Sequence, residues 1–293
     1  MGTLHKSGLA EQAPGGTQQE RVETRRKADG DAASPPLQPF LRMRNVDVAR
    51  GEKIVLRRVN LEIAEGEHVA ILGPNGCGKS TLIKAITSEC YPIVGPGMER
   101  LIYGRERWDL MELRKHLGVV SAELPGERTP RTLGIDAVVS GFFSSSTLWP
   151  NLEVTAQMRE RAEEALARMQ ASHLRGRWVG EMSAGETRRV MIARALVHRP
   201  AMLLLDEPSN ALDLAAQREL REILRGVART AGILMVTHQL ADILPEIHRV
   251  VMMREGEIVA DGAKGELLTE RRLSELFGVE VTLTERNGYW HSW

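Results

Sequence analysis

Residues 73–81 read Gly-Pro-Asn-Gly-Cys-Gly-Lys-Ser-Thr and carry the strongest chemical signal in the chain. The spacing Gly-x-x-x-x-Gly-Lys-Ser is typical of a loop whose backbone N–H groups surround phosphates. Lys79 is expected to reach the outer phosphates, and the Ser80 hydroxyl is suited to Mg²⁺. The predicted ligand is therefore a nucleoside triphosphate with magnesium. The predicted nucleotide-binding residues of the loop are Gly73, Pro74, Asn75, Gly76, Cys77, Gly78, Lys79, Ser80 and Thr81.

The segments on both sides of this loop support the same interpretation. Residues 69–72 read Val-Ala-Ile-Leu, which has the length and branching of a buried strand. Residues 82–86 read Leu-Ile-Lys-Ala-Ile and predict a helix whose positive dipole end faces the phosphates. The alternative is an ordinary glycine-rich turn, which would not require this strand before it and this helix after it.

Acidic residues and a histidine follow two later apolar runs. Asp206 and Glu207 come after residues 201–205, and His238 comes shortly after residues 233–236. Ligands bind at the carboxyl ends of strands in open α/β sheets. Asp206 is predicted to hold Mg²⁺, directly or through water, and Glu207 to orient or deprotonate the attacking water. On its own, His238 would more often be a core residue with satisfied hydrogen bonds.

Two further groups of residues have a local structural explanation. Ser183 and Glu186 have the Ser-x-x-Glu spacing of a capping box, which predicts the start of a helix. The Ser183 hydroxyl, the Gly185 N–H and the helix dipole would together also form an anion site. Asp213 precedes an amphipathic run and could simply cap its helix.

The remaining pattern predicts an α/β fold with a parallel sheet. Residues 40–48 and 54–63 alternate as antiparallel strands do, whereas buried strands alternate with helices later in the chain. Residues 1–38 are poor in apolar side chains and are predicted to form a disordered tail. The main domain is expected over residues 39–275, with a helical subdomain at about 123–190 and a C-terminal extension at 276–293.

Composition excludes several classes of protein. Lys plus Arg and Asp plus Glu both number 39, so the formal charge is zero and gives no basic surface for nucleic acid. No apolar stretch approaches the length that spans a bilayer, and the first residues do not resemble a secretion signal. A cytoplasmic protein is therefore expected. The two cysteines do not predict a disulfide framework.

Taken in order, these motifs resemble the nucleotide-binding domain of ABC ATPases over about residues 40–265. The resemblance implies a P-loop NTPase core with a parallel sheet, an antiparallel β subdomain and a helical subdomain. It implies that residues 73–81 are the Walker A motif, residues 203–206 the Walker B motif, and residues 182–186 the signature. It also implies that Glu207 is the catalytic carboxylate, that His238 is the switch histidine contacting γ-phosphate, and that Asp213 belongs to the D-loop.

The family resemblance carries further expectations about activity and partners. It implies an ATPase that uses ATP and Mg²⁺, closes as a homodimer on ATP binding, and powers transmembrane permease subunits. Ser183, Gly185 and Glu186 would then contact the ATP bound by the other subunit. The protein would lie in the cytoplasm, at the inner face of the cell membrane.

Two positions depart from the family pattern. Arg50 stands where the family usually has an aromatic ring that stacks on adenine, and a guanidinium plane can also stack. Ser121, Ala122 and Glu123 stand where the family has a glutamine that links Mg²⁺ to the membrane partner. Some segments are similar to importer ATPases for iron complexes or molybdate.

Three other functions are alternatives to a transporter ATPase. A soluble ABC-type ATPase with a regulatory role is the main alternative. A chromosome or repair ATPase of the SMC type would need a long heptad region, which the sequence lacks. A module that binds nucleotide without hydrolysis is opposed by Lys79, Asp206, Glu207 and His238, which are all present.

Overall fold

The computed structural model describes residues 39–121, 124 and 126–293, which belong to one compact unit running from Gln38 to Trp293. The predicted disordered tail, residues 1–38, lies outside the described residues. The strands are β1 Pro39–Arg50, β2 Lys53–Ala64, β3 Val69–Leu72, β4 Glu99–Ile102, β5 Leu117–Val120, β6 Met202–Asp206, β7 Gly232–Thr237, β8 Arg249–Arg254, β9 Glu257–Ala263, β10 Leu283–Arg286 and β11 Tyr289–Ser292. The α-helices are α2 Lys79–Ile86, α3 Leu110–His116, α4 Gly134–Val139, α5 Ala156–Arg168, α6 Ala184–Leu196, α7 Leu214–Ala228, α8 Lys264–Leu267 and α9 Glu270–Phe277. Short 3-10 helices are η1 Thr129–Arg131, η2 Ser140–Phe143, η3 Ser172–Leu174, η4 Val179–Glu181 and η5 Leu240–Asp242.

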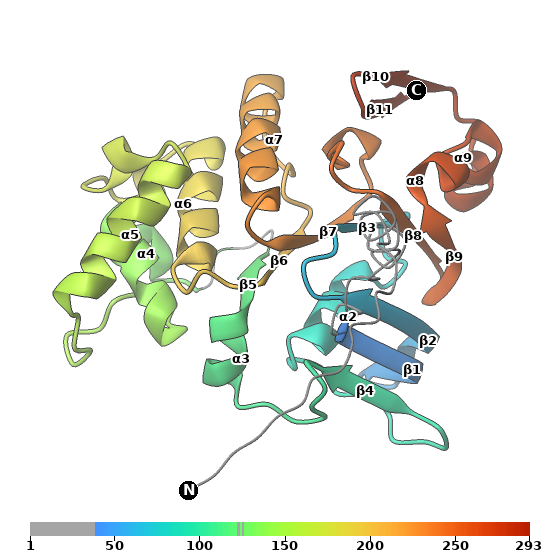
Figure 1. The fold of residues 1–293 in the computed structure, drawn as a ribbon, viewed down its shortest axis with the longest axis horizontal. Coiled ribbons are helices and arrows are strands. Elements are labelled where there is room, and N and C mark those ends of the chain that lie inside the picture. The colour runs from blue at the N-terminus through green and yellow to red at the C-terminus, as the bar shows by residue number, and fades with distance from the viewer. Residues whose placement is uncertain (1–38, 122–123, 125) are drawn as a thin grey trace, which may run out of the picture. The chain divides into compact units, whose positions relative to one another are not determined.

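The largest sheet of the described chain has the strand order β5-β6-β7-β3-β8-β9 (Figure 1). Its strands run parallel from β5 to β8, and β9 returns antiparallel to β8. Ile71 of β3 pairs with Val236 of β7 on one side and with Val251 of β8 on the other. Every residue of β3, β6 and β7 is buried, as expected for parallel strands that are covered on both faces.

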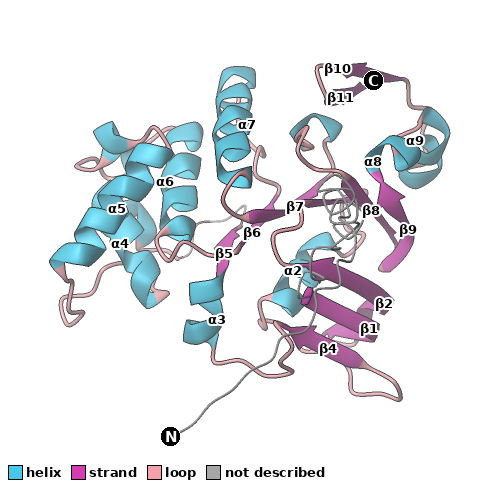
Figure 2. Cartoon of the chain, viewed as in Figure 1, coloured by secondary structure: helices cyan, strands magenta, loops and turns pink. Residues whose placement is uncertain are grey.

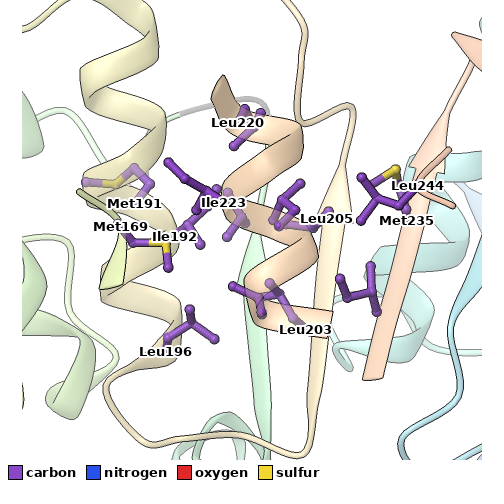
Figure 3. Close-up of a cluster of buried hydrophobic side chains, with 14 of the residues drawn as sticks. Met169, Met191, Ile192, Leu196, Leu203, Leu205, Leu220, Ile223, Met235 and Leu244 are labelled. Carbon is purple, nitrogen blue, oxygen red and sulfur yellow. The ribbon is translucent and has the colours of Figure 1, made fainter. Parts of the chain in front are cut away.

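Strand β3 divides its side chains between two hydrophobic cores, because successive residues of a strand point to opposite faces. Ala70 and Leu72 join the core that includes α4, α5, α6 and α7, whereas Val69 and Ile71 join the core that includes α2, β1 and β2. Part of the first core is seen in Figure 3, where side chains of α6 and α7 meet those of β6 and β7. The labelled residues of these four elements are Met191, Ile192, Leu196, Leu203, Leu205, Leu220, Ile223 and Met235.

Strands β1, β2 and β4 form a separate antiparallel sheet (Figure 2). The alternation of buried and exposed residues in β2 explains why one face of this sheet packs on a core. Helices α4, α5 and α6 contact one another and form the helical region on the left of Figure 1. The predicted fold class, a P-loop-type α/β core with an antiparallel sheet and a helical part, is confirmed.

The C-terminal residues have structure that the sequence did not predict. Helix α9 ends at Phe277, and Gly278 caps it with a φ of 72°. Strands β10 and β11 then form a hairpin, and β11 packs against η5. The boundaries expected for the main domain, the helical subdomain and the extension at residues 276–293 stay predictions.

Candidate functional site

The predicted phosphate loop connects β3 to α2, as the sequence indicated. At two positions of this loop only glycine fits, because other atoms lie where a Cβ would be. A Cβ on Gly73 would lie 2.3 Å from the Met253 carbonyl oxygen, and one on Gly78 would lie 2.8 Å from the Leu56 side chain. Gly78 also has a φ of 110° and forms the N-cap of α2. The tight curve of the loop therefore depends on residues without side chains.

Lys79 is the first residue of α2 and lies inside the curve of this loop. Only 5% of the residue is exposed, and its Nζ donates hydrogen bonds to the carbonyls of Gly73 at 2.8 Å and Pro74 at 3.1 Å. The same ammonium lies 3.5 Å from Glu207 Oε1. A buried ammonium inside this loop, at the start of a helix, is suited to a phosphate anion.

Asp206 is the last residue of β6, and Ser80 lies in α2, the helix that follows the loop. Both residues line a cavity of about 470 Å³. The Asp206 Oδ1 atom is buried and has no hydrogen-bond partner among the described residues. Burial raises the pKa of Asp206, while Ser80 and Lys79 act to lower it. A buried carboxylate oxygen without a partner, beside a serine hydroxyl, fits a magnesium ion, which binds oxygen ligands.

Glu207 follows the end of β6 and turns away from it. Its φ of 49° is uncommon for a residue with a side chain. Its N–H donates to the Val236 carbonyl at 2.8 Å, which holds the turn against β7. Its Oε2 lies 2.8 Å from His238 Nδ1. The structure therefore brings together Lys79, Glu207 and His238, three residues that the sequence predicted for one site.

Ser183 and Glu186 form the predicted capping box at the start of α6. The Glu186 N–H donates to Ser183 Oγ at 3.2 Å, and the Ser183 N–H donates to Glu186 Oε2 at 2.8 Å. The second bond is the main reason why the pKa of Glu186 is lowered. Asp213 likewise caps α7, accepting from the Ala216 N–H at 2.8 Å. In the described part of the chain, no hydrogen bond or ion pair links the capping box to residues 73–81.

Comparison with known proteins identifies the family. The model of the ABC transporter family matches residues 56–210. A putative ABC transporter ATP-binding protein of Streptococcus mutans is 32% identical over 248 residues, which cover 83% of this chain and 94% of that protein. The chain belongs to the ABC transporter family. It is an ATP-binding and ATP-hydrolysing subunit that powers a membrane transporter, as the order of its motifs predicted.

Other relatives of this ABC protein agree with the assignment. The cobalt import ATP-binding protein CbiO of Rhodobacter capsulatus is 36% identical over 218 residues, covering 73% of this chain and 74% of that protein. The structure of cbiO1 from Clostridium perfringens, part of the complex cbiONQ, has a TM-score of 0.67 and 26% identity, covering 81% of this chain and 94% of that one. The dimeric cassette MJ0796, bound to ADP and Pi, has a TM-score of 0.63 and 26% identity, covering 76% of this chain and 98% of that one. A soluble ATPase without a transporter is not favoured by these relatives.

The residues that depart from the ABC pattern are Arg50, the last residue of β1, and residues 121–123, which follow β5 in sequence. Arg50 is exposed at the end of β1, where it pairs with Lys53 across the β1–β2 turn. Ser121 is exposed, and its carbonyl accepts from the Arg188 guanidinium at 2.8 Å. Ala122 and Glu123 lie outside the described residues. The role of Arg50 in stacking on adenine and that of residues 121–123 therefore stay predictions.

Two residues beside the site of this ABC protein were not predicted from the sequence. Arg188, on α6, is buried, and burial lowers its pKa while Asp206 acts to raise it. It connects the helix behind the signature to the segment after β5. Gly256, in the β8–β9 turn, donates its N–H to the Cys77 carbonyl of the phosphate loop at 2.9 Å. Neither residue has a distinctive signal in the sequence, because Arg188 stands beside Arg189 in a polar stretch of α6 and Gly256 lies in an ordinary hairpin turn.

None of the helices in the described ranges is both long and apolar enough to cross a membrane.

Proposed function

We propose that this ABC protein hydrolyses ATP with magnesium at residues 73–81, Asp206, Glu207 and His238. The observation that carries the proposal is the contact of Glu207 with His238 on one side and with Lys79 on the other. In this arrangement Lys79 would bind the outer phosphates, and His238 would contact the γ-phosphate. Glu207 would orient the attacking water and take its proton.

We propose that Ser80 and Asp206 hold Mg²⁺ when ATP is bound. The buried Asp206 Oδ1 atom without a partner supports this assignment. The described residues contain no cluster of three His, Cys, Asp or Glu side chains that could hold a metal ion by themselves. The remaining ligands would therefore be phosphate oxygens and water, as is usual for Mg²⁺. Bound there, the ion would neutralise charge that develops on the phosphates.

We propose that the active form is a homodimer in which Ser183, Gly185 and Glu186 of one subunit face the ATP of the other. Two observations support the proposal. The Ser183 hydroxyl lies at the positive end of α6, and together they suit an anion. The residues of the capping box make no hydrogen bond or ion pair with residues 73–81 of the same described chain. Asp213 would lie in the loop that crosses this interface.

We also propose that the dimer docks on transmembrane permease subunits at the inner face of the cell membrane. The support comes from the relatives, since the cbiO1 cassette is part of the complex cbiONQ and CbiO is named as a cobalt import protein. An importer is the direction that these names favour. Importers of iron complexes or molybdate stay the predicted subgroup.

Two variants separate binding from hydrolysis. Lys79→Ala removes the ammonium inside the loop, so ATP binding should weaken at least about tenfold and hydrolysis should be lost. Glu207→Gln keeps the volume of the side chain but removes its charge, so ATP should still bind while turnover falls at least about a hundredfold. Binding is measured with a fluorescent ATP analogue and turnover by phosphate release.

Lys115→Ala is the control for Lys79→Ala. Lys115 is exposed on α3, and its ion pair is with Glu112 of the same helix. This control should bind and hydrolyse ATP like the wild type. Hydrolysis at the wild-type rate by Glu207→Gln would show that another group activates the water.

A further inference from the structure

Asp242 is a buried carboxylate with no role in the proposed function. It lies at the end of η5 and is only 2% exposed. Its Oδ2 accepts two hydrogen bonds, from Ser209 Oγ at 2.7 Å and from Thr237 Oγ1 at 2.8 Å. Ser209 lies two residues after Glu207, and Thr237 immediately precedes His238. One carboxylate oxygen therefore joins the two segments that carry the proposed water-activating and phosphate-contacting groups.

The Thr237 hydroxyl has more than one possible acceptor. Its Oγ1 lies 2.8 Å from Asp242 Oδ2 and 3.4 Å from Glu207 Oε2, and it accepts from the Gln239 N–H at 3.0 Å. A hydroxyl has one proton to donate, and 3.4 Å is long for an O–H···O bond. The proton therefore goes to Asp242, and Glu207 faces the Thr237 oxygen without receiving it. The oxygen of Asp242 has lone pairs for both hydroxyls whether or not the carboxyl is ionised.

The direction of this hydrogen bond matters for Glu207. A carboxylate that accepts a hydrogen bond is stabilised in its charged form and becomes a weaker base. Glu207 already lies 2.8 Å from His238 Nδ1 and 3.5 Å from Lys79 Nζ. We propose that Asp242 is a positioning residue for ATP hydrolysis, which takes the Thr237 proton and so prevents a further donor from holding Glu207. The proposal rests on the proposed function of Glu207.

The surroundings of Asp242 keep it in this place. Its own N–H donates to the Gln239 carbonyl at 3.2 Å, which closes the turn of η5. From outside, the Arg221 guanidinium lies 3.4 Å from the Ala241 carbonyl and 5.6 Å from the Tyr289 ring of β11. The backbone around Asp242 is thus held by the turn of η5 and by Arg221 of α7, and the hydrogen bonds of the carboxylate come from Ser209 and Thr237 rather than from the nucleotide loop. Its removal should leave ATP binding largely intact.

A double-mutant comparison tests the proposal. Asp242→Ala frees the Thr237 proton for Glu207, so kcat should fall about 3- to 10-fold while the Kd for ATP changes less than about threefold. Adding Thr237→Val removes that hydroxyl, so the double variant should hydrolyse ATP at least about threefold faster than Asp242→Ala alone. A residue that served only packing would give a double variant equal to or slower than Asp242→Ala, and that result would overturn the proposal.

Two single variants extend the comparison. Ser209→Ala removes the other donor to the same oxygen without freeing the Thr237 proton, so its kcat should stay within about twofold of the wild type. Thr237→Val alone should slow turnover less than Asp242→Ala does. A larger loss for Thr237→Val would mean that its hydroxyl serves Glu207 directly, which contradicts the proposal.

A conservative variant covers the case in which Asp242→Ala does not fold. Asp242→Asn keeps an acceptor oxygen, so its kcat should stay within about threefold of the wild type, with an unchanged thermal midpoint. A loss beyond about tenfold with an intact fold would overturn the proposal, because the acceptor alone would then not suffice.

Glu207→Gln is assayed in parallel to separate the two proposals. If it hydrolyses ATP at the wild-type rate, the proposed function of Glu207 fails and the role of Asp242 fails with it. If it is inactive, the Asp242 and Thr237 variants test the positioning role separately from the function of Glu207.

Discussion

Asp206 and Glu207 are neighbours in sequence, but their surroundings give them different chemistry. The Asp206 side chain is buried with one oxygen unpartnered, whereas Glu207 has a positive φ and contacts His238 and Lys79. The change in backbone direction after β6 is what separates the two carboxylates. At the scale of single residues, this separation would allow Asp206 to hold the proposed metal ion while Glu207 stays available to water.

The magnesium assignment predicts a specific defect for Asp206→Asn. The amide carries no negative charge and is a weaker ligand than a carboxylate, so half-maximal hydrolysis should require at least about tenfold more Mg²⁺. Because burial raises the pKa of Asp206, its ionised form at neutral pH opposes folding, and this cost disappears as pH falls through the folded-state pKa. When Mg²⁺ is absent, Asp206→Asn should therefore have a thermal midpoint at pH 7 equal to or above that of the wild type. An unchanged Mg²⁺ requirement would contradict the assignment.

The two cysteines should differ in reactivity. Burial raises the pKa of the Cys77 thiol in the phosphate loop, so little thiolate is present at neutral pH. Cys90 is half-buried and serves as an internal reference. At pH 7, N-ethylmaleimide should modify Cys77 at least about fivefold more slowly than Cys90, and the Cys77 rate should rise between pH 7 and pH 9. Mass spectrometry of timed samples measures both rates. Equal rates at pH 7 would show that the loop opens readily.

At the scale of elements, the β8–β9 turn supports the phosphate loop. Gly256 has a φ of 86°, donates to the Cys77 carbonyl and accepts from the Arg57 N–H. A Cβ at this position would lie 2.2 Å from the Val55 carbonyl oxygen. The turn thus fits between β2 and the loop only as glycine.

Gly256→Ala should therefore destabilise the protein and its nucleotide site together. The strain of a positive φ and the contact with Val55 should cost roughly 1–3 kcal/mol, and the thermal midpoint should fall accordingly. The affinity for ATP should also decrease, because the loop loses its neighbour. Gly226→Ala in α7 is the control, since a Cβ there meets no atom within 4 Å and alanine favours a helix. If Gly256→Ala were as stable as this control, the turn would not support the phosphate loop as described.

Elements with a strong local signal were predictable from sequence. Residues 69–72 were expected as a buried strand and residues 82–86 as a helix, and β3 and α2 contain them. The capping box at Ser183 was also predictable, because the side chains that cap α6 are three residues apart. The β10–β11 hairpin was missed because its short strands are stabilised by packing on η5, which lies some forty residues earlier in the chain.

Contacts between distant segments of the chain also limited what could be predicted of the site. Lys79, Glu207 and His238 belong to motifs, and their types and positions sufficed to predict them. The hydrogen bonds of Asp242 and the contact of Gly256 with the phosphate loop join residues that are distant in sequence or have no distinctive spacing. Such partners follow from the strand order β6-β7-β3-β8, which places the ends of distant segments side by side.

At the scale of the whole molecule, we propose that one chain holds two halves of different ATP sites. Residues 73–81 with Glu207 form one half, and the start of α6 forms the other. The described contacts within one chain do not join them. Slow hydrolysis should then preserve the closed dimer, since hydrolysis normally reopens it.

The most direct test is the mass of Glu207→Gln in solution, measured by size-exclusion chromatography with light scattering. With saturating Mg²⁺ and ATP this variant should shift from monomer to dimer and return to monomer when ATP is removed. Adding Ser183→Asp keeps an N-cap acceptor for α6 but places a negative charge at the proposed phosphate contact. That double variant should stay folded and monomeric. If Glu207→Gln remains monomeric at saturating Mg²⁺ and ATP, the two-site dimer is contradicted.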